Sequence, residues 1–479
     1  PSSWDDGFSV IDYRTVDPAF GDWKDVARFC PHFRLMFDAV INHVSARSAW
    51  FQAFLRDDPA YRDYFIVVPD GTDLSKVCRP RPGLPLTCYP TPGGEKAVWT
   101  TFSANQIDLN YQHPQVLLEI IDVLLFYVAQ GAEFIRLDAI AYLWKEIGTP
   151  CIHLPQTHQV VQLFRTILDI VAPQVMLITE TNVPHRENIS YFKDGAQLVY
   201  QFSLAPLVLH TFRAGNAEAL QSWVAGLEKL PSTATFFNFI ASHDGIGVRP
   251  AEGILTPAEM QALADQTLTH GGHVSYKTNP DGSQSVYELN ITLFDVLSDP
   301  KSREPEGVKI DRFMTSQAMM LALAGVPGIY VHSLVGSPNH HAGVTETGRA
   351  RTINREKWRR VDLEAALNNP NARAARVFNR YVALLKARAA HSAFHPDGQQ
   401  RVITGNPAIF NLLRTSPDGR ERVLCVHNIT DQTQQLEINV SNLALAETLQ
   451  DILLAEKMET QNQVLHLTLA PYEMRWLAG

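Results

Sequence analysis

Three carboxylates stand where short apolar runs end, and carboxylates that such runs bring together could carry out glycosyl transfer. Asp138 closes the run Ile-Arg-Leu-Asp, Glu180 closes Leu-Ile-Thr-Glu, and Asp244 lies in Ser-His-Asp-Gly. Transfer through an oxocarbenium-like transition state needs a carboxylate nucleophile and a carboxylic acid that protonates the leaving oxygen. Each motif alone also has a structural interpretation, so the prediction depends on the three occurring together and in order.

An arginine accompanies the first of these carboxylates. Arg136 lies two residues before Asp138, and residues two apart on a strand share one face. A guanidinium at this distance would orient the carboxylate and keep it ionised. We therefore expect Arg136 and Asp138 to act as a pair.

The elements that must position these residues alternate between strands and helices. Helical spacing of apolar residues predicts helices over 116–128, 160–171 and 314–323. Short apolar runs predict strands over 33–41, 133–138, 175–180, 198–204, 235–240 and 329–332. This alternation indicates an α/β fold with a parallel sheet, and at this length a (β/α)8 barrel is the leading solution. Barrel enzymes carry catalytic groups at the carboxyl ends of their strands, where all three carboxylates fall.

Two long stretches interrupt the alternation, and a different pattern follows it. Residues 45–110 are predicted to be an irregular, proline-rich inserted subdomain, and 245–300 a second insertion with a turn at 279–282. The catalytic barrel then comprises 1–44 and 111–391. After residue 392 short strands alternate with turns, which predicts a C-terminal β domain over 392–479.

Composition excludes several classes of protein. The 479 residues are 45% hydrophobic and 19% charged, with a net charge of −9, which is ordinary for a globular protein without a nucleic-acid partner. The five cysteines form no CxxC pair, which argues against a disulfide framework or a zinc site. No leader or membrane-spanning run is visible, so we expect a cytoplasmic protein without a membrane partner. We expect the protein to be a monomer or a homodimer.

The ordered motifs resemble the signature regions of glycoside hydrolase family 13. Asp38-Ala-Val-Ile-Asn-His43 resembles the first region, Arg136-Leu-Asp138 the second, Glu180 the third and His243-Asp244 the fourth. The resemblance implies that Asp138 is the nucleophile, that Glu180 is the general acid and base, and that Asp244 stabilises the transition state. It also implies a set of residues that line the glucosyl pocket: Asp5, His43, Phe102, Gln106, Arg136 and His243.

Further segments are similar to the sucrose phosphorylase branch, in which phosphate replaces water in the second half-reaction. The similar segments are Asp5–Tyr13, Arg79–Pro85, Lys145–Cys151, Ser242–Gly247 and Ile353–Arg355. This similarity implies α-glucose 1-phosphate as product, with retained configuration, and inorganic phosphate as co-substrate. It places Arg81 and Arg355 near the phosphate and acceptor.

The acceptor is the least determined part of this resemblance. Segments 277–290 and 336–348 look more like those of glucosylglycerate phosphorylases than those of plain sucrose phosphorylases. A small carboxylate acceptor such as D-glycerate would need a cation, for which Arg81 is the best candidate. Residues Ser285, Tyr287 and Glu288 fall where acceptor contacts are expected. Phosphorolysis of sucrose or sucrose 6′-phosphate, or hydrolysis and transglucosylation, are the alternatives within this class.

Two expectations concern what the chain lacks. Asn42 matches a calcium ligand of amylases in the wider family, but the phosphorylase branch generally does without calcium, so we predict no metal and no cofactor. The family's first strand and helix should precede Asp5, and the chain starts at that motif. We therefore expect a barrel with an open edge, marginal in isolation, which leaves a non-catalytic relative or an inactive fragment as an alternative.

Overall fold

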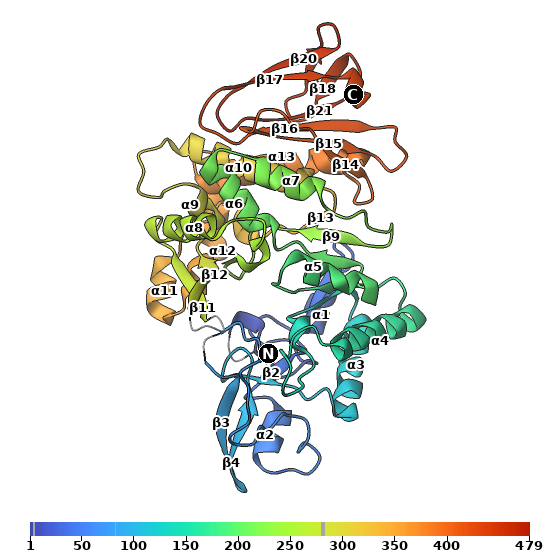
Figure 1. Cartoon of the computed structure of the whole chain (residues 1–479), viewed down its shortest axis with the longest axis vertical. Coiled ribbons are helices and arrows are strands. Elements are labelled where there is room, and N and C mark those ends of the chain that lie inside the picture. Colours follow the sequence, from blue (N-terminus) through green and yellow to red (C-terminus); the bar gives the residue numbers. More distant parts are fainter. Residues whose placement is uncertain (3–4, 82, 279–282) are drawn as a thin grey trace. The chain divides into compact units, whose positions relative to one another are not determined.

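The computed structural model describes residues 1–2, 5–81, 83–278 and 283–479 (Figure 1). The turn predicted at 279–282 lies outside the described residues. The chain divides into two compact units. Unit 1 comprises Pro1–Asn182 and Arg186–Tyr200, and unit 2 comprises Val183–His185 and Gln201–Gly479.

A parallel sheet forms the centre of unit 1. Its strands follow the order β1 (Leu35–Ala39), β6 (Ala132–Leu137), β7 (Met176–Thr179) and β8 (Leu198–Tyr200). All three pairings are parallel, and Leu137 stands opposite Thr179 at the carboxyl ends of β6 and β7. The residues that follow these two, Asp138 and Glu180, therefore leave neighbouring strands at the same level.

Helices pack on this sheet as the apolar spacing predicted. Helix α3 (Pro114–Ala129) and helix α4 (Pro155–Val171) each begin with proline, whose fixed φ suits the first helical position. Val116, Ile120 and Val123 of α3 are fully buried in the core of unit 1. Shorter helical elements complete this part of the unit: η1 (Asp5–Gly7), α1 (Trp23–Ala27), η2 (Ile140–Tyr142) and η3 (Ile189–Asp194). Helix α5 (His185–Asn188) lies where the chain passes between the units.

The first inserted stretch is more regular than its prolines predicted. It contains α2 (Ala49–Leu55) and an antiparallel hairpin of β3 (Leu86–Thr91) and β4 (Gly94–Trp99). Strand β2 (His43–Ser45) pairs with β5 (Gln106–Asp108), so the two ends of the stretch meet. The pairing of β2 with β5 carries His43 and Gln106 into one place.

Unit 2 contributes two further parallel strands and most of the helices. Strand β9 (Thr235–Asn238) pairs with β13 (Val326–Pro327). The strand predicted over 329–332 is wrong, because the chain leaves β13 at Gly328, whose missing Cβ makes room for the Phe237 ring, and turns into the 3₁₀ helix η5 (Val331–Leu334). The helices are α6 (Leu204–Ala214), α7 (Glu218–Ala225), α10 (Glu306–Ala322), α11 (His341–Thr347), α12 (Arg360–Asn368) and α13 (Arg373–Ala390).

The second inserted stretch also holds regular structure. It contains β10 (Ile246–Gly247), η4 (Arg249–Ala251), α8 (Pro257–Thr269), β11 (His273–Thr278), β12 (Gln284–Asn290) and α9 (Leu293–Leu297). Strand β12 lies between β10 and β11, antiparallel to both. This small sheet stands beside Asp244, which comes two residues before β10.

The C-terminal β domain predicted after residue 392 is confirmed. Its main sheet has the order β14 (Gln399–Val402), β15 (Ile409–Thr415), β16 (Arg422–Asn428), β21 (Met474–Ala478), β18 (Thr448–Asp451) and β19 (Glu456–Glu459). Strands β17 (Gln434–Asn439) and β20 (Val464–Leu469) form a second, two-stranded sheet. Phe410, Val423 and Trp476 pack in one core with residues of α10 and α13.

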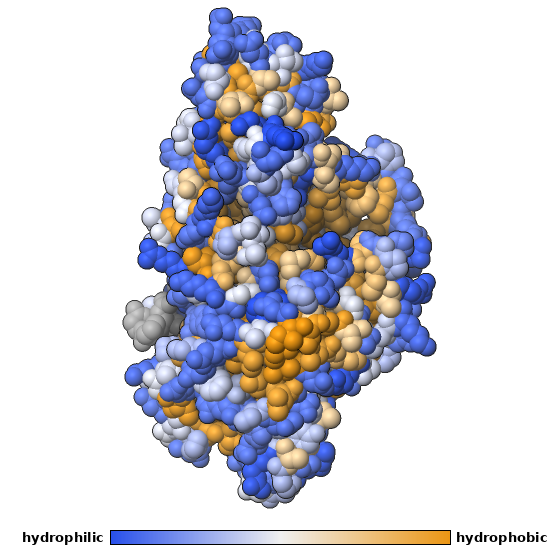
Figure 2. All heavy atoms as spheres, turned by 90° about the vertical axis from the view of Figure 1, so that its right-hand side faces the viewer, coloured by the Kyte–Doolittle hydropathy of each residue, from blue (hydrophilic) through white to orange (hydrophobic). Residues whose placement is uncertain are grey.

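The surface mixes charged and apolar residues. Figure 2 shows apolar patches on one face among hydrophilic side chains. Large exposed apolar residues of the chain include Phe20, Phe33 and Ile170. No helix within the described ranges is both long enough and apolar enough to cross a membrane.

Candidate active site

One guanidinium in unit 1 holds three carboxylates. Arg136 Nη1 lies 2.8 Å from Asp138 Oδ1 and donates to both oxygens of Asp38, at 2.7 and 2.9 Å. Its Nη2 lies 3.9 Å from Oε2 of Glu180. The predicted nucleophile and the predicted acid therefore contact the same cation, as expected for groups at the ends of adjacent strands.

Glu180 has a second anchor in the backbone. The N–H of Ala139 donates to Glu180 Oε2 over 2.9 Å. Ala139 adopts a φ of 49°, a left-handed conformation that costs free energy for a residue with a Cβ. This strained residue follows Asp138 directly, so one turn positions both carboxylates.

Burial and charge set the protonation state of this cluster. Burial alone would lower the pKa of Arg136, but Asp38, Tyr200, Asp138 and Glu180 raise it overall. Burial also raises the pKa of Tyr200, whose hydroxyl accepts from Arg136 Nε at 2.9 Å. Both shifts favour a charged Arg136 and a neutral Tyr200 at neutral pH.

The side of the site around His43 is fixed by hydrogen bonds to the N-terminal segment. The Phe8 carbonyl lies 2.9 Å from His43 Nε2 and accepts from Gln106 Nε2 at 2.7 Å. Phe102 packs against His43, with ring centroids 5.4 Å apart, and edge-on against Tyr142. The structure therefore brings His43, Phe102 and Gln106 together.

Asp5 and Arg81 both belong to unit 1. Asp5 is part of η1, and its carbonyl accepts from the N–H of Phe8, next to the His43 contact. Arg81 is partly exposed and donates to the Pro80 carbonyl, and among the described residues its guanidinium forms no ion pair. Burial lowers the pKa of Arg79, and the positive charge of Arg81 lowers it further. The two guanidiniums are therefore close enough to repel each other.

The residues that resemble a calcium site surround an ammonium group. Lys145 Nζ lies 2.6 Å from Asp108 Oδ2 and donates to Asn42 Oδ1 at 2.8 Å. Both charged side chains are almost completely buried, and burial lowers the pKa of Lys145. Calcium would need these same oxygens as ligands, and the lysine already takes them, so the residues present do not fit the ion.

Asp244 is the centre of a charged cluster within unit 2. Arg351 Nη1 lies 2.5 Å from Asp244 Oδ1, and Arg355 Nη2 lies 3.4 Å from the same oxygen. Arg351 also forms a two-bond pair with Glu288, at 3.0 and 2.6 Å. His243 Nε2 is 3.7 Å from Asp244 Oδ2, so the cluster contains two arginines, two carboxylates and a histidine.

The predicted acceptor contacts lie on β12, whose pairing with β11 is irregular. Ser275 pairs with Glu288 and Tyr276 with Val286, so Tyr287 is an extra residue in the strand and the simple alternation of faces does not hold here. Glu288 points toward Gly245, where an added Cβ would lie 2.5 Å from its Cγ. The structure joins Glu288 to Asp244 through Arg351.

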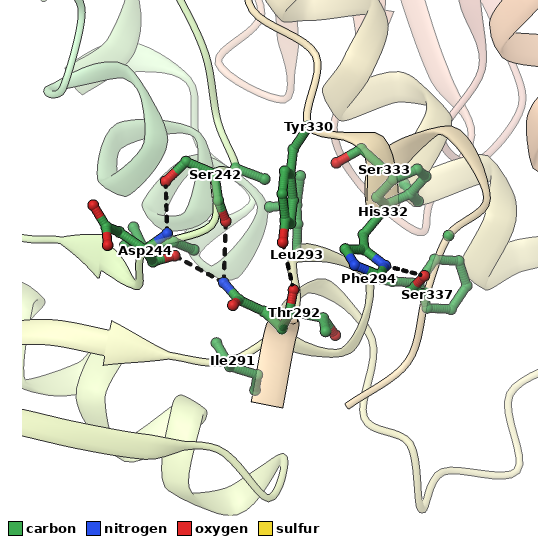
Figure 3. A pocket seen from close by; sticks show the side chains of 15 residues that line it. Ser242, Asp244, Ile291, Thr292, Leu293, Phe294, Tyr330, His332, Ser333 and Ser337 are labelled. Atoms are coloured by element: carbon green, nitrogen blue, oxygen red, sulfur yellow. Dashed lines mark hydrogen bonds between the residues drawn. The ribbon is translucent and has the colours of Figure 1, made fainter. Parts of the chain in front are cut away.

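A small cavity lies behind the loop that carries Asp244 (Figure 3). Asn354 donates to the carbonyls of Ser242 and Asp244, and its own carbonyl accepts from Tyr330 Oη. About 20 Å³ of the cavity is free, which is room for a single water molecule. The cavity therefore supports the loop and does not hold a sugar.

Several residues of these clusters were not predicted as site residues, among them Asp38, Lys145 and Arg351. Asp38 and Lys145 lie in the quoted segments Asp38–His43 and Lys145–Cys151, so a sequence signal for them existed. Arg351 comes two residues before the Ile353–Arg355 segment, in the 3₁₀ helix η6 (Ala350–Asn354). Its pairing with Asp244 and Glu288 joins residues far apart in the chain and had no local signal.

Comparison with known families decides the classification of the chain. Residues 2–246 match the family described as the catalytic domain of α-amylase, and residues 401–476 match the C-terminal domain of maltogenic amylase. The chain belongs to the α-amylase family. The family expected from the sequence, glycoside hydrolase family 13, is thereby confirmed, and so is its barrel-type fold with a C-terminal β domain.

Relatives within this family are phosphorylases. A glucosylglycerate phosphorylase of Allomeiothermus silvanus is 54% identical over 91% of this chain and 78% of its own length. One from Escherichia coli is 42% identical over 100% of this chain and 84% of its own. The crystal structure of sucrose 6F-phosphate phosphorylase from Thermoanaerobacter thermosaccharolyticum superposes with a TM-score of 0.78 at 25% identity, covering 90% and 86% of the two chains. This member of the α-amylase family is therefore an enzyme of the phosphorylase group.

Proposed function

We propose that the enzyme catalyses the reversible phosphorolysis of 2-O-α-glucosyl-D-glycerate to α-glucose 1-phosphate and D-glycerate. The observation that carries the chemistry is the Arg136 guanidinium that Asp138 and Glu180 share at the ends of β6 and β7. The substrate class is proposed from the relatives named as glucosylglycerate phosphorylases, at 42% and 54% identity.

The proposed mechanism is a double displacement in which Asp138 and Glu180 divide the work. Asp138 attacks the anomeric carbon, and the bond to the glycerate oxygen breaks as Glu180 gives that oxygen its proton. A phosphate oxygen then attacks the glucosyl ester, passing its proton to Glu180 and releasing Asp138. Two inversions give net retention. Contact with Arg136 supports this division, because the guanidinium orients the nucleophilic carboxylate.

The proposed role of Arg81 is to bind the carboxylate of the acceptor or the phosphate. Both are planar or tetrahedral anions that a guanidinium binds through paired N–H donors. Two features support the role: Arg81 forms no ion pair among the described residues, and a second guanidinium, that of Arg79, lies nearby. Neighbouring cations repel each other, and a bound anion would relieve that repulsion.

We propose that the reaction needs no metal ion or other cofactor. The support is Lys145, whose buried ammonium is bonded to Asn42 and Asp108. Treatment with a chelator should leave the rate of phosphorolysis and the melting temperature unchanged. A chelator-dependent loss that calcium restores would contradict this proposal.

The deciding experiment is synthesis from α-glucose 1-phosphate with D-glycerate, fructose, fructose 6-phosphate or glycerol as acceptor. The rate of phosphate release measures the use of each acceptor. Preferred use of D-glycerate supports the proposal. Preference for fructose or its phosphate would move the enzyme to the sucrose side of the phosphorylase group. Release of glucose without an acceptor, at the same rate as phosphate release with an acceptor, would indicate a hydrolase. Folded protein that turns over none of these substrates would contradict the proposal that the protein is an enzyme.

A further inference from the structure

Asp244 does not stand alone in the structure, because a charged cluster within unit 2 holds its carboxylate. Asp244 Oδ1 accepts hydrogen bonds from Arg351 Nη1 at 2.5 Å and from Arg355 Nη2 at 3.4 Å. The backbone around it is fixed as well, since Arg355 Nε donates to the His243 carbonyl at 2.6 Å and Asn354 donates to the Asp244 carbonyl at 2.8 Å. Segment 351–355 thus holds both the side chain and the main chain of this loop.

Arg351 is anchored from its other side. Its Nε and Nη2 donate to the two oxygens of Glu288, a geometry that fixes the plane of the guanidinium. The Glu288 side chain is only 3% exposed, whereas those of Arg351 and Asp244 are 23% and 26% exposed. Glu288 is therefore the buried end of a chain of ion pairs, and Asp244 is the end that solvent reaches.

The backbone of the loop is shaped to admit this arrangement. A Cβ on Gly245 would lie 2.6 Å from Glu288 Oε1, so glycine lets the carboxylate approach the residue that follows Asp244. Gly247 also pairs with Glu288 in the β10–β12 ladder. Strand β12 and the Asp244 loop are thus connected by backbone pairing, by close packing and by Arg351.

We propose that Arg351 is a positioning residue for Asp244, and that Glu288 serves as its buried counter-charge rather than as a contact for the acceptor. This inference rests on the proposed function and on the role that the family resemblance implies for Asp244, stabilisation of the transition state. A guanidinium bound to a rigid carboxylate fixes Asp244 before the substrate arrives, so no reorganisation is needed during the reaction. Arg351 acts through Asp244, to which it is bonded.

The test must separate positioning from folding, because loss of Arg351 alone leaves a buried carboxylate without its cation. The double variant Arg351→Met with Glu288→Gln removes both charges together, so Glu288 is not left as a buried charge without a partner. We expect normal melting and a fall in kcat of about 100-fold, as misplacing a catalytic group by about 1 Å produces. The fall should be equal with D-glycerate and with glycerol as acceptor, and Arg351→Lys should recover part of it.

Arg312 and Glu304 provide the matched control. This second arginine–glutamate pair of unit 2 is also two-bonded, at 2.8 and 2.5 Å, and partly buried, but it has no bond to Asp244. Arg312→Met with Glu304→Gln should leave kcat within about twofold of the wild type. Added guanidinium ion, below denaturing concentration, should raise the activity of Arg351→Ala and not that of the Arg312 variant.

A comparison with Asp244→Asn completes the experiment. If Arg351 acts through Asp244, adding Arg351→Met and Glu288→Gln together to Asp244→Asn should lower kcat little more than Asp244→Asn alone, because the effects are not additive. If the variant with Arg351→Met and Glu288→Gln folds and keeps the wild-type kcat, or changes only the KM for D-glycerate, the proposal is overturned. Inactive wild-type protein would instead contradict the proposed function and is thereby distinguished.

Discussion

At the scale of single residues, the carboxylates that end strands could be predicted and their partners only in part. Asp138 and Glu180 were predictable because apolar strands and charged strand ends are local patterns. Asp38 and Lys145 lie in segments that carried a family resemblance, and their roles appear only in three dimensions. Arg351 joins Asp244 to Glu288 across large separations in the chain, which no local pattern encodes.

The first prediction concerns the nucleophile. Asp138→Asn should lower kcat by at least about 1,000-fold, since an amide cannot form the glucosyl ester. The fold should persist, because Arg136 keeps its two bonds to Asp38. Steady-state phosphate release and thermal melting measure the two effects.

Asp122→Asn is a suitable control for that variant, since its carboxylate is exposed and pairs only on the surface with Arg14. Its activity should match the wild type. Appreciable turnover by Asp138→Asn would remove Asp138 as the nucleophile.

A second prediction at this scale concerns the buried lysine. Lys145→Met should lower the free energy of unfolding by about 3–5 kcal/mol, because it leaves the carboxylate of Asp108 buried without a cation. Denaturation with urea measures the change. Arg14→Met, which breaks an exposed pair, should cost less than about 1 kcal/mol. Equal losses of unfolding free energy in the two variants would show that the buried Lys145–Asp108 pair stabilises the fold no more than an exposed pair does.

At the scale of elements, strong apolar periods were reliable and irregular composition was misleading. The helix expected over 116–128 is confirmed as α3, and the strand expected over 133–138 as β6. The strand expected over 329–332 failed because glycine at 328 lets the chain turn away. Helix α8 was missed within the second insertion, although Thr256-Pro-Ala-Glu259 is a capping-box signal.

The capping box of α8 carries a prediction with a pH dependence. Thr256→Ala should lower the free energy of unfolding by about 1 kcal/mol at neutral pH. Hydrogen bonds from Thr256 lower the pKa of Glu259 below its ordinary value of 4.5. This contribution to stability is therefore present above pH 4.5 and is lost as the pH falls through the lower pKa of the folded state.

Urea denaturation of Thr256→Ala and wild type, at neutral pH and below pH 4.5, tests this dependence. The difference between the two proteins should shrink in acid. Thr269→Ala is the control, because Thr269 lies in the same helix and bonds only to the Asp265 carbonyl on its exposed side. A difference that grows in acid would contradict the assignment to Glu259.

At the scale of the whole molecule, the C-terminal β domain is joined to unit 2 by a common core. Trp476 and Phe410 pack in the same cluster as Met314 of α10 and Tyr381 of α13. Fully buried Arg414 of β15 donates to the carbonyls of Ala322, His395 and Gln399, and so caps the last turn of α10. Sequence patterns predicted a separate domain, because the change from helices to short strands is visible and the shared core is not.

This shared core predicts that the domain cannot be removed. A chain that ends at residue 391 would expose the apolar surface beneath Trp476 and leave the α10 carbonyls without Arg414, so we expect it to lose cooperative melting and turnover. Circular dichroism melting and the phosphorolysis assay measure both. Arg414→Met tests the same contact within the intact chain and should destabilise it while leaving kcat of the folded fraction unchanged, because Arg414 bonds to no site residue. A shortened chain that melts cooperatively and retains wild-type kcat would show that the two parts are independent domains, as composition alone suggested.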